Sequence, residues 1–360
     1  MGVFEAMVGA GSHEQVIHCA DRATGLGAII AIHDTTLGPA LGGCRMWHYS
    51  REEDAVTDVL RLSRGMTFKS AVARTGLGGG KAVILGDPKT QKTPELFKAM
   101  GRFVHTLAGR YTTAEDVGVN EQDMLYVRET TPYVTGLPRI KGGSGDPSPV
   151  TALGVFLGLK ACVEEALDRS DLSGVKVALQ GIGHVGFHLG KLLVEEGAEL
   201  VVTDVNESRL AEAAKELGAR VVAPADIYDV DCDVFAPCAL GAVLNDRTIP
   251  SLKCKVVAGA ANNQLAEERH GDDLLRRGIV YAPDFVINAG GIINVSVEFL
   301  EGGYDEEVSM KKVRNIYQAI KDIIRTGKEQ GIPTSQAAIV LAEQILANGR
   351  RKKEGLGPEY

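Results

Sequence analysis

The sequence has no apolar run near the length of a membrane-spanning helix, and it has no excess of positive charge. Its formal net charge is -8 at pH 7, and only the terminal stretch "GRRKKEG" gathers basic residues. This balance argues against nonspecific binding to nucleic acid or to anionic lipid. The first fifteen residues also lack the basic and apolar segments of a secretory signal. Together these absences predict a cytoplasmic protein that binds neither membrane nor nucleic acid.

The sequence also lacks paired cysteines and any obvious metal-binding pattern. No C-x-x-C motif occurs, and the six cysteines are scattered: Cys19, Cys44, Cys162, Cys232, Cys238 and Cys254. In a chain of 360 residues with 44% hydrophobic residues, we expect buried free thiols in a reducing compartment. His184 and His188 are spaced for one helical face but have no third ligand nearby, so no metal site is predicted.

The glycine-rich stretch "GLGGGKAVILGD" (residues 76–87) does not match the pattern of a nucleotide-binding phosphate loop. Thr75 stands where the first glycine should be, and Ala82 follows Lys81 where a hydroxyl residue is required. The run "KAVIL" instead predicts a buried strand that begins at Lys81. An enclosed ammonium loses its proton readily, so Lys81 is a candidate for chemistry. We expect the glycines before it to clear space for a ligand.

The chain is long enough for two domains, and both are predicted to be α/β. Strand-like "LGAIIAIHD" and helix-like "EEDAVTDVLRLSRGM" mix in the first third. Glycine, proline and serine then cluster in "PRIKGGSGDPSPVT" (138–151), which is typical of a domain boundary. Strand and helix patterns alternate after it, and this alternation is typical of a parallel, doubly wound sheet.

The second domain carries a dinucleotide-binding pattern in "VKVALQGIGHVGFHLGKLLVEEGAELVVTDVNES". Gly181, Gly183 and Gly186 follow an apolar strand and open a helix, and Asp204 ends the next strand. The glycines allow a tight turn, a close approach to pyrophosphate and close helix packing. Asp204 would accept from the adenosine ribose hydroxyls and repel an extra phosphate, which predicts NAD as the cofactor. A methyltransferase that binds S-adenosylmethionine uses similar features and is an alternative at this point.

Several long motifs occur in an order that removes this alternative. They are "AIIAIHDTTLGPALGG", "RLSRGMTFK", "GLGGGKAVI", "TAEDVG", "DPSPVTALGV", "DVFAPCALG", "AGAANNQL" and "YAPDFVINAGGIINV". In these motifs, which extend over nearly the whole chain, the sequence resembles the glutamate/leucine/phenylalanine/valine dehydrogenases. The resemblance implies an NAD-dependent oxidative deaminase with two domains and a substrate cleft between them.

The resemblance also implies a role for individual residues. Lys81 resembles the catalytic lysine and Asp116 the proton-exchanging acid, while Lys69 corresponds to the lysine that pairs with the substrate α-carboxylate. Gly42 and Asn263 correspond to further substrate contacts. The residues expected to contact the cofactor are Gly181, Ile182, Gly183, His184, Val185, Gly186, Asp204, Thr151, Ala261 and Asn262.

The same resemblance places Leu41, Ala114, Ile292 and Val295 around the substrate side chain. All four are apolar, and glutamate-specific relatives carry a cation where Leu41 stands, so a buried second carboxylate would lack a partner. Branched aliphatic substrates are expected, leucine first and then valine and isoleucine. Aromatic amino acids are the alternative, which Gly186 slightly favours because alanine is more common there in leucine-specific relatives. A catalytically dead NAD-binding protein is a remote alternative, since both lysines and the aspartate are present.

The expected domains are residues 1–147 with a C-terminal helix of about 331–360, and residues 148–330. By resemblance the first binds substrate and mediates assembly, and the second is a Rossmann-type NAD domain. A homo-oligomer is expected, and an octamer by family resemblance.

Overall fold

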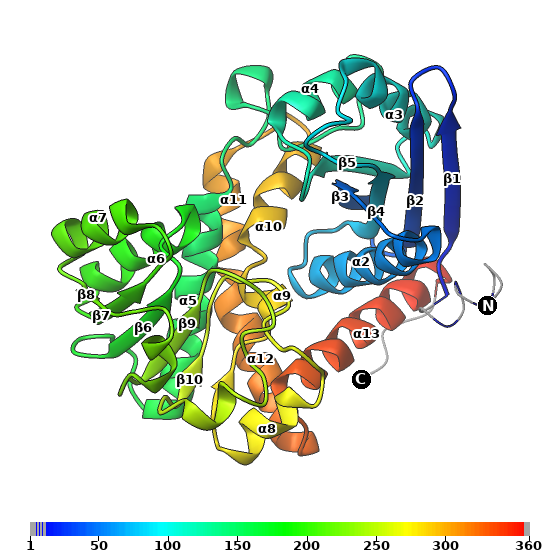
Figure 1. The fold of residues 1–360 in the computed structure, drawn as a ribbon. Helices are drawn as coiled ribbons and strands as arrows, with labels where there is room; N and C mark the ends of the chain where they lie inside the picture. Colours follow the sequence, from blue (N-terminus) through cyan, green and yellow to red (C-terminus); the bar gives the residue numbers. More distant parts are fainter. Residues whose placement is uncertain (1–4, 6, 8, 10–11, 356–360) are drawn as a thin grey trace. The chain divides into compact units, whose positions relative to one another are not determined.

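The computed structural model describes residues 12–355 together with Glu5, Met7 and Gly9, and the chain divides into two compact units (Figure 1). The first unit comprises Met1–Asp146, Val295–Asp305 and Ala342–Tyr360, and the second comprises Pro147–Asn294 and Glu306–Leu341. The chain therefore returns to the first unit twice, whereas the sequence led us to expect one return near residue 331. Hydrogen bonds explain the extra return, because Glu298 Oε1 accepts from the backbone N–H groups of Gly136 (3.2 Å) and Ser144 (2.8 Å).

The first unit is built on a five-stranded mixed sheet with the order β1-β2-β4-β3-β5. Its strands are β1 (Gln15–Asp21), β2 (Leu26–Asp34), β3 (Ala40–Trp47), β4 (Gly78–Leu85) and β5 (Tyr111–Glu115). β2 runs antiparallel to β1 and β4, while β3 runs parallel to β4 and β5. The carboxyl ends of β3, β4 and β5 therefore lie at one edge of the sheet.

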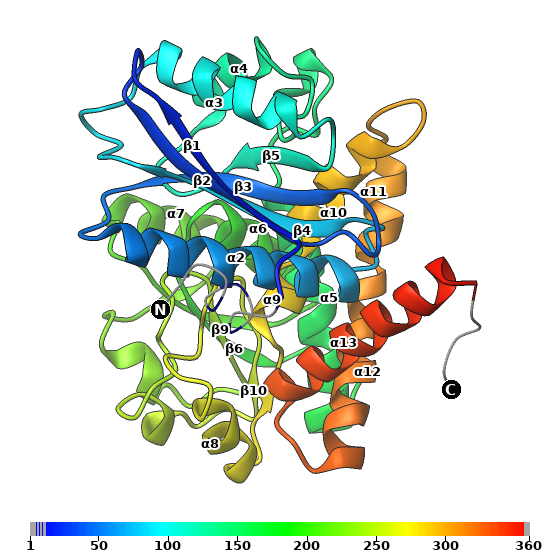
Figure 2. The same cartoon turned by 90° about the vertical axis from the view of Figure 1, so that its right-hand side faces the viewer.

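Helices cover both faces of this sheet, which explains why its central strands β2, β4 and β3 are mostly buried. Figure 2 shows α2 (Glu52–Val72) on one face and α3 (Pro94–Thr106) with α4 (Glu121–Arg128) on the other. On the α2 face, Val59 and Leu60 pack against Ile29, Ala31 and Val83. A larger cluster fills the opposite face. Among its members are Ile30, Ile32, Ala82, Ile84, Phe97, Met100 and Met124.

The second unit has a six-stranded parallel sheet with the order β11-β10-β9-β6-β7-β8. Its strands are β6 (Lys176–Gln180), β7 (Glu199–Thr203), β8 (Arg220–Val221), β9 (Val234–Pro237), β10 (Val256–Val257) and β11 (Val280–Tyr281). The strand order reverses between β6 and β9, as in a doubly wound Rossmann-type sheet. The expected fold class, α/β in two domains with a parallel Rossmann-type sheet, is confirmed.

The helices from residue 148 onward precede, connect or follow these strands, and the last of them extends into the first unit. The helices are α5 (Ser148–Leu167), α6 (His184–Glu195), α7 (Glu207–Leu217), α8 (His270–Arg276), α9 (Asp284–Ile287), α10 (Gly290–Ser296), α11 (Glu306–Val313), α12 (Asn315–Gln330) and α13 (Thr334–Lys353). α5 packs against α6 and α12. Against the opposite side of the sheet, Phe235 and Val257 pack with Ile249 and Leu274.

Two expectations from the sequence concern membrane-spanning helices and disulfide bonds. None of the helices among the described residues is both long and apolar enough to cross a membrane. All six cysteines are free thiols; Cys238 is half-buried and the other five are buried. Burial raises the pKa of the Cys19 and Cys254 thiols to about 11, so these groups stay protonated and unreactive.

Candidate functional site

The parallel strands of the first unit bring Lys81 and Asp116 together. Lys81 lies in β4 and Asp116 directly follows β5, and Lys81 Nζ is 3.0 Å from Asp116 Oδ2. Lys81 is only 5% exposed, so its ammonium lies inside the unit, not on the surface. Arg45 of β3 reaches the same carboxylate oxygen with its Nε at 2.9 Å. Two cations and one carboxylate therefore meet at the carboxyl edge of the sheet.

Burial and charge shift the pKa values of this pair in a way that suits proton transfer. Burial lowers the pKa of Lys81 below its usual 10.5, and Asp116 opposes this shift without cancelling it. Burial would raise the pKa of Asp116, but the charges of Lys81 and Arg45 outweigh it, so the pKa lies below 3.8. The pair is asymmetric because Asp116 has two cationic neighbours. Asp116 stays ionised, while Lys81 can supply a neutral amine at a lower pH than an exposed lysine does.

Strand register places three expected site residues on one face of the sheet, the face that α2 covers. Leu41 pairs with Gly79, which lies two residues before Lys81, and Gly43 pairs with Ala114. Because alternate residues of a strand share a face, Leu41, Lys81 and Ala114 point the same way. Leu41 is buried and Ala114 is half-buried. The last turn of α2 carries Lys69, which is also half-buried.

The glycine run before Lys81 has a different role from the one the sequence suggested. Gly78, Gly79 and Gly80 belong to β4 itself, and protein atoms fill the space beside them. A Cβ atom on Gly79 would lie 2.1 Å from the backbone nitrogen of Thr67, and one on Gly80 would lie 2.7 Å from the Tyr111 ring. The glycines let α2 and Tyr111 approach the strand, so our expectation that they clear space for a ligand was wrong.

Gly42 sits in an equally crowded place on β3. A Cβ atom there would lie 1.7 Å from the Gly80 carbonyl oxygen. The Gly42 carbonyl oxygen accepts a hydrogen bond of 2.6 Å from the Tyr111 hydroxyl. That oxygen already has a protein partner, so the prediction of a substrate contact at Gly42 rests on its other backbone atoms.

In the second unit the glycine-rich turn has the geometry that a pyrophosphate needs. Gly181 has φ +97°, and a Cβ atom on Gly186 would lie 2.0 Å from the Gly181 carbonyl oxygen. α6 begins at His184, and no side chain caps its first backbone N–H groups. These donors, together with the helix dipole, suit an anionic group. The residues present therefore fit a dinucleotide.

Asp204 lies beside this turn, at the end of β7. Its Oδ2 accepts from the Ile182 backbone N–H at 2.6 Å, and its Oδ1 accepts from the Asn206 N–H at 2.9 Å. Backbone donors thus fix the orientation of the carboxylate next to the turn. Val185 and His184 lie in the first turn of α6, where His184 is exposed.

The expected nicotinamide-side residues lie on loops and helices near the other strands of this unit. The Asn262 side-chain oxygen accepts from Asn288 Nδ2 at 2.7 Å, and Asn263 has the unusual φ of +50°. Ala261 is buried, with its N–H bonded to the Pro237 carbonyl at 2.9 Å. Thr151 lies on α5, with its hydroxyl 3.3 Å from the Cβ position of Gly291. Ile292 and Val295, which were expected around the substrate side chain, lie on α10, three residues apart and so on one side of the helix; Ile292 belongs to the second unit and Val295 to the first.

Sequence reasoning missed four residues around Asp116 and Asn262. Arg45 donates to Asp116 and Asn288 donates to Asn262, while Asp58 accepts from both Arg45 and Tyr49. Arg45 was within reach, because it lies two residues after the quoted motif "AIIAIHDTTLGPALGG", on the strand that carries Leu41. Asn288 lies within the quoted motif "YAPDFVINAGGIINV", whereas Asp58 and Tyr49 lie in none of the quoted motifs.

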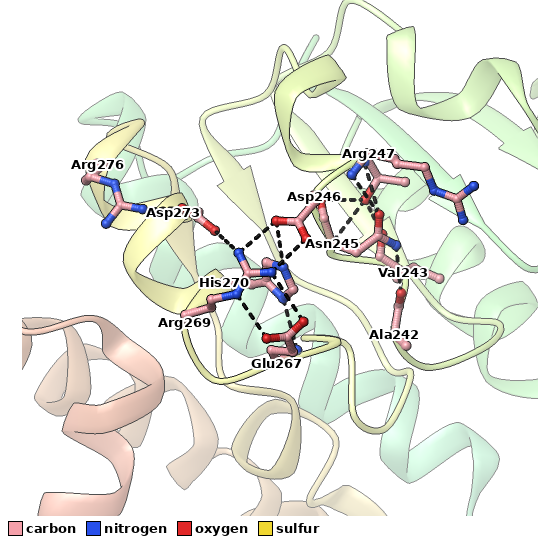
Figure 3. Close-up of polar contacts among 11 residues, drawn as sticks. Ala242, Val243, Asn245, Asp246, Arg247, Glu267, Arg269, His270, Asp273 and Arg276 are labelled. Atoms are coloured by element: carbon pink, nitrogen blue, oxygen red, sulfur yellow. Dashed lines mark hydrogen bonds and ion pairs between the residues drawn. The ribbon is translucent and has the colours of Figure 1, made fainter.

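A second polar cluster belongs to the second unit (Figure 3). Asp246, Glu267 and His270 offer ligand atoms within 4.8 Å of one another. However, Arg269 pairs with both carboxylates, at 2.6 Å from Asp246 and 2.9 Å from Glu267. His270 Nδ1 accepts the Glu267 backbone N–H at 2.9 Å, so the proton of a neutral ring is on Nε2, which then has no lone pair for a metal. The cluster is an ion-pair network and not a metal site.

Known dehydrogenases resemble this chain over most of its length. Two family models match, "Glu/Leu/Phe/Val dehydrogenase, dimerisation domain" over residues 13–133 and "Glutamate/Leucine/Phenylalanine/Valine dehydrogenase" over residues 202–353. A leucine dehydrogenase of Thermoactinomyces intermedius is 55% identical, over 95% of this chain and 93% of that protein. An L-tryptophan dehydrogenase of Nostoc punctiforme is 49% identical, over 95% of each.

The three-dimensional comparison agrees. The crystal structure of an L-tryptophan dehydrogenase from Nostoc punctiforme superposes with a TM-score of 0.88 at 47% sequence identity. The match covers 97% of this chain and all of that one.

Proposed function

The chain belongs to the glutamate/leucine/phenylalanine/valine dehydrogenase family and is an amino-acid dehydrogenase, and we propose that it deaminates L-leucine and other branched aliphatic L-amino acids with NAD. The products would be the 2-oxo acid, ammonia and NADH. The observation that carries the proposal is the buried Lys81–Asp116 pair, with 3.0 Å between its charged atoms. Such a pair supplies two neighbouring groups that can accept and return protons, a carboxylate and a buried amine.

The proposed roles follow from the charge and burial of each group. Lys69 would pair with the substrate α-carboxylate and so fix the position of Cα. Bound NAD would supply the hydride acceptor. Asp116 would exchange protons with the amino group, and neutral Lys81 would activate the water that attacks the resulting imine. The proposal requires the substrate held by the first unit to meet the cofactor held by the second.

The preference for leucine is supported by the four apolar residues expected around the substrate side chain and by the higher identity to a leucine dehydrogenase than to a tryptophan dehydrogenase. A panel of kcat/KM values over leucine, valine, isoleucine, phenylalanine, tryptophan and glutamate tests it. We expect the three aliphatic substrates to lie within about 200-fold of one another, because one methylene contributes roughly 1–3 kcal/mol. A strong aromatic preference would overturn the substrate assignment, and no turnover of any amino acid would overturn the activity.

We propose NAD over NADP because the Asp204 carboxylate stands beside the glycine-rich turn. A 2′-phosphate there would meet a negative charge, and like-charge contacts cost several kcal/mol, so kcat/KM with NAD should exceed that with NADP at least about 100-fold. Asp204→Asn should narrow this ratio, since it removes the charge and keeps the shape. Equal use of both cofactors by the unmodified enzyme would contradict the assignment.

We also propose a homo-oligomer in the cytoplasm. The matched dimerisation domain supports the assembly, and the free cysteines support a reducing compartment. For the number of subunits we propose the octamer that the family resemblance implies.

A further inference from the structure

The ion pair of Lys81 and Asp116 is the inner part of a longer chain of hydrogen bonds. Arg45 donates through Nε to Asp116 Oδ2 at 2.9 Å and through Nη1 to Asp58 Oδ2 at 2.9 Å. The Tyr49 hydroxyl donates to the same Asp58 oxygen at 2.7 Å. One guanidinium therefore bridges Asp116 and a carboxylate of α2, and a tyrosine fixes that second carboxylate.

The contacts on Asp116 are distributed unequally between its two oxygens. Lys81 Nζ (3.0 Å) and Arg45 Nε (2.9 Å) both approach Oδ2. No other side chain or backbone N–H of the described residues bonds to this carboxylate, so Oδ1 receives no donor from them. An oxygen that already accepts from two cations is a poor proton acceptor. Oδ1 is then the oxygen that can exchange a proton with a ligand.

The backbone around Asp116 supports this fixed orientation. A Cβ atom on Gly43 would lie 2.8 Å from Asp116 Cβ and 2.5 Å from the Glu115 carbonyl oxygen. β3 therefore packs tightly against the end of β5, and only glycine at position 43 leaves room for Asp116. The backbone fixes the Cβ atom, and the remaining freedom, rotation of the carboxylate, is removed by Arg45.

We propose that Arg45, anchored by Asp58 and Tyr49, is a positioning residue that holds Asp116 through Oδ2 and so presents Oδ1 to the substrate amino group. This inference rests on the proposed function. Arginine suits the task because its planar fork can donate to two carboxylates at once, whereas a lysine is a single point charge. The exposures of the side chains, 22% for Arg45, 18% for Asp58 and 21% for Asp116, leave the bonds only partly screened.

The charge of Arg45 also predicts a change in pH dependence. The groups that interact with Asp116 are Lys81 from β4, Arg45 and Cys44 from β3, and Tyr111 and Glu115 from β5. Burial is the main cause that lowers the pKa of Lys81, and Arg45 lowers it further. Without this cation the pKa values of both Lys81 and Asp116 rise. Deamination needs neutral Lys81, so the ascending limb of kcat against pH should move to higher pH.

The test compares four variants of the full-length enzyme with leucine and NAD. Arg45→Gln should lower kcat about 100-fold, as expected for a misplaced acid, change KM much less, and shift the ascending limb to higher pH. Arg45→Lys should keep the limb near its original position and recover only part of kcat, because the charge remains but the fork is lost. Tyr49→Phe should lower kcat by less than about tenfold without moving the limb. The matched control is Arg51→Gln, since Arg51 is exposed and pairs only with Glu53 among the described residues.

Each outcome decides the proposal. If the ascending limb of kcat against pH is not shifted in Arg45→Gln, Arg45 only supports the fold, even where kcat is reduced. That result would overturn the inference. If Arg45→Gln does not fold, Arg45→Lys decides, because wild-type kcat with a lysine there would show that the fork is not needed. A wild-type enzyme that turns over no amino acid would instead refute the proposed function, which separates the two failures.

Discussion

Replacing Lys81 by alanine is expected to lower kcat/KM for leucine deamination by about 100- to 10,000-fold, the usual contribution of an acid–base group. The Lys81 side chain is 7% exposed and its Nζ lies 3.0 Å from Asp116 Oδ2, so alanine removes a buried amine from direct contact with that carboxylate. NADH formation followed by absorbance measures the loss. Binding of NADH, measured by fluorescence, should remain, because the glycine-rich turn belongs to the other unit.

Two further measurements make this prediction specific. Ethylamine in the assay should restore part of the activity of Lys81→Ala, because it returns a neutral amine to the vacated space. In the unmodified enzyme the ascending limb of kcat against pH should lie below 10.5, since burial lowers the pKa of Lys81. Lys89→Ala is the control, because Lys89 is exposed in the same unit. Full activity of Lys81→Ala would refute the assigned role.

The second large effect is expected from Gly42→Ala, which should destabilise the protein by roughly 1–3 kcal/mol or more, the usual cost of overpacking. The added Cβ would lie 1.7 Å from the Gly80 carbonyl oxygen, and backbone cannot rotate away as a side chain can. β3 and β4 must separate, which also moves Lys81 relative to Asp116. We expect a lower apparent Tm at fixed protein concentration together with a lower kcat.

The matched control for this variant is Gly27→Ala. Gly27 also lies in a strand of the same sheet, but a Cβ atom there would meet no atom within 4 Å. Its Tm should change by only a few degrees. If Gly42→Ala and Gly27→Ala were equally stable and active, the close packing of β3 on β4 would not be needed for the site.

Parts of the fold were predictable because local patterns were strong. The strand at 26–34 has the limits that its apolar pattern predicts, and an apolar strand at 176–180 precedes the glycine-rich turn as expected. β3 was not predicted, because "ALGGCRMW" contains two glycines and an arginine and therefore lacks the usual pattern of a strand. These residues suit a strand here because of their neighbours in the fold, which the sequence does not reveal. The two glycines lie close against Gly80 and Asp116, and the arginine donates hydrogen bonds to two carboxylates.

The residues of the candidate site were likewise predictable only where the sequence carries a local pattern. Lys81 and Asp116 were named from the sequence, and the structure places them in contact. Asp58 and Tyr49 lie 58 and 67 residues before Asp116, and only the packing of α2 on the sheet brings them near it. A sequence pattern carries local periodicity, but it does not carry hydrogen bonds between distant side chains.

The threefold division of the first unit has a consequence for synthesis on the ribosome. Asp34 in β2 is bonded to Arg350 at 2.9 Å, and the Thr35 carbonyl to Lys353 at 3.0 Å, across more than 300 intervening residues. These partners emerge last, whereas Pro147–Asn294, most of the second unit, is complete much earlier. Domains usually mature from the N-terminus during translation. Here the strands of the first unit are synthesised first, but that unit is completed only after Arg350 and Lys353 have been synthesised.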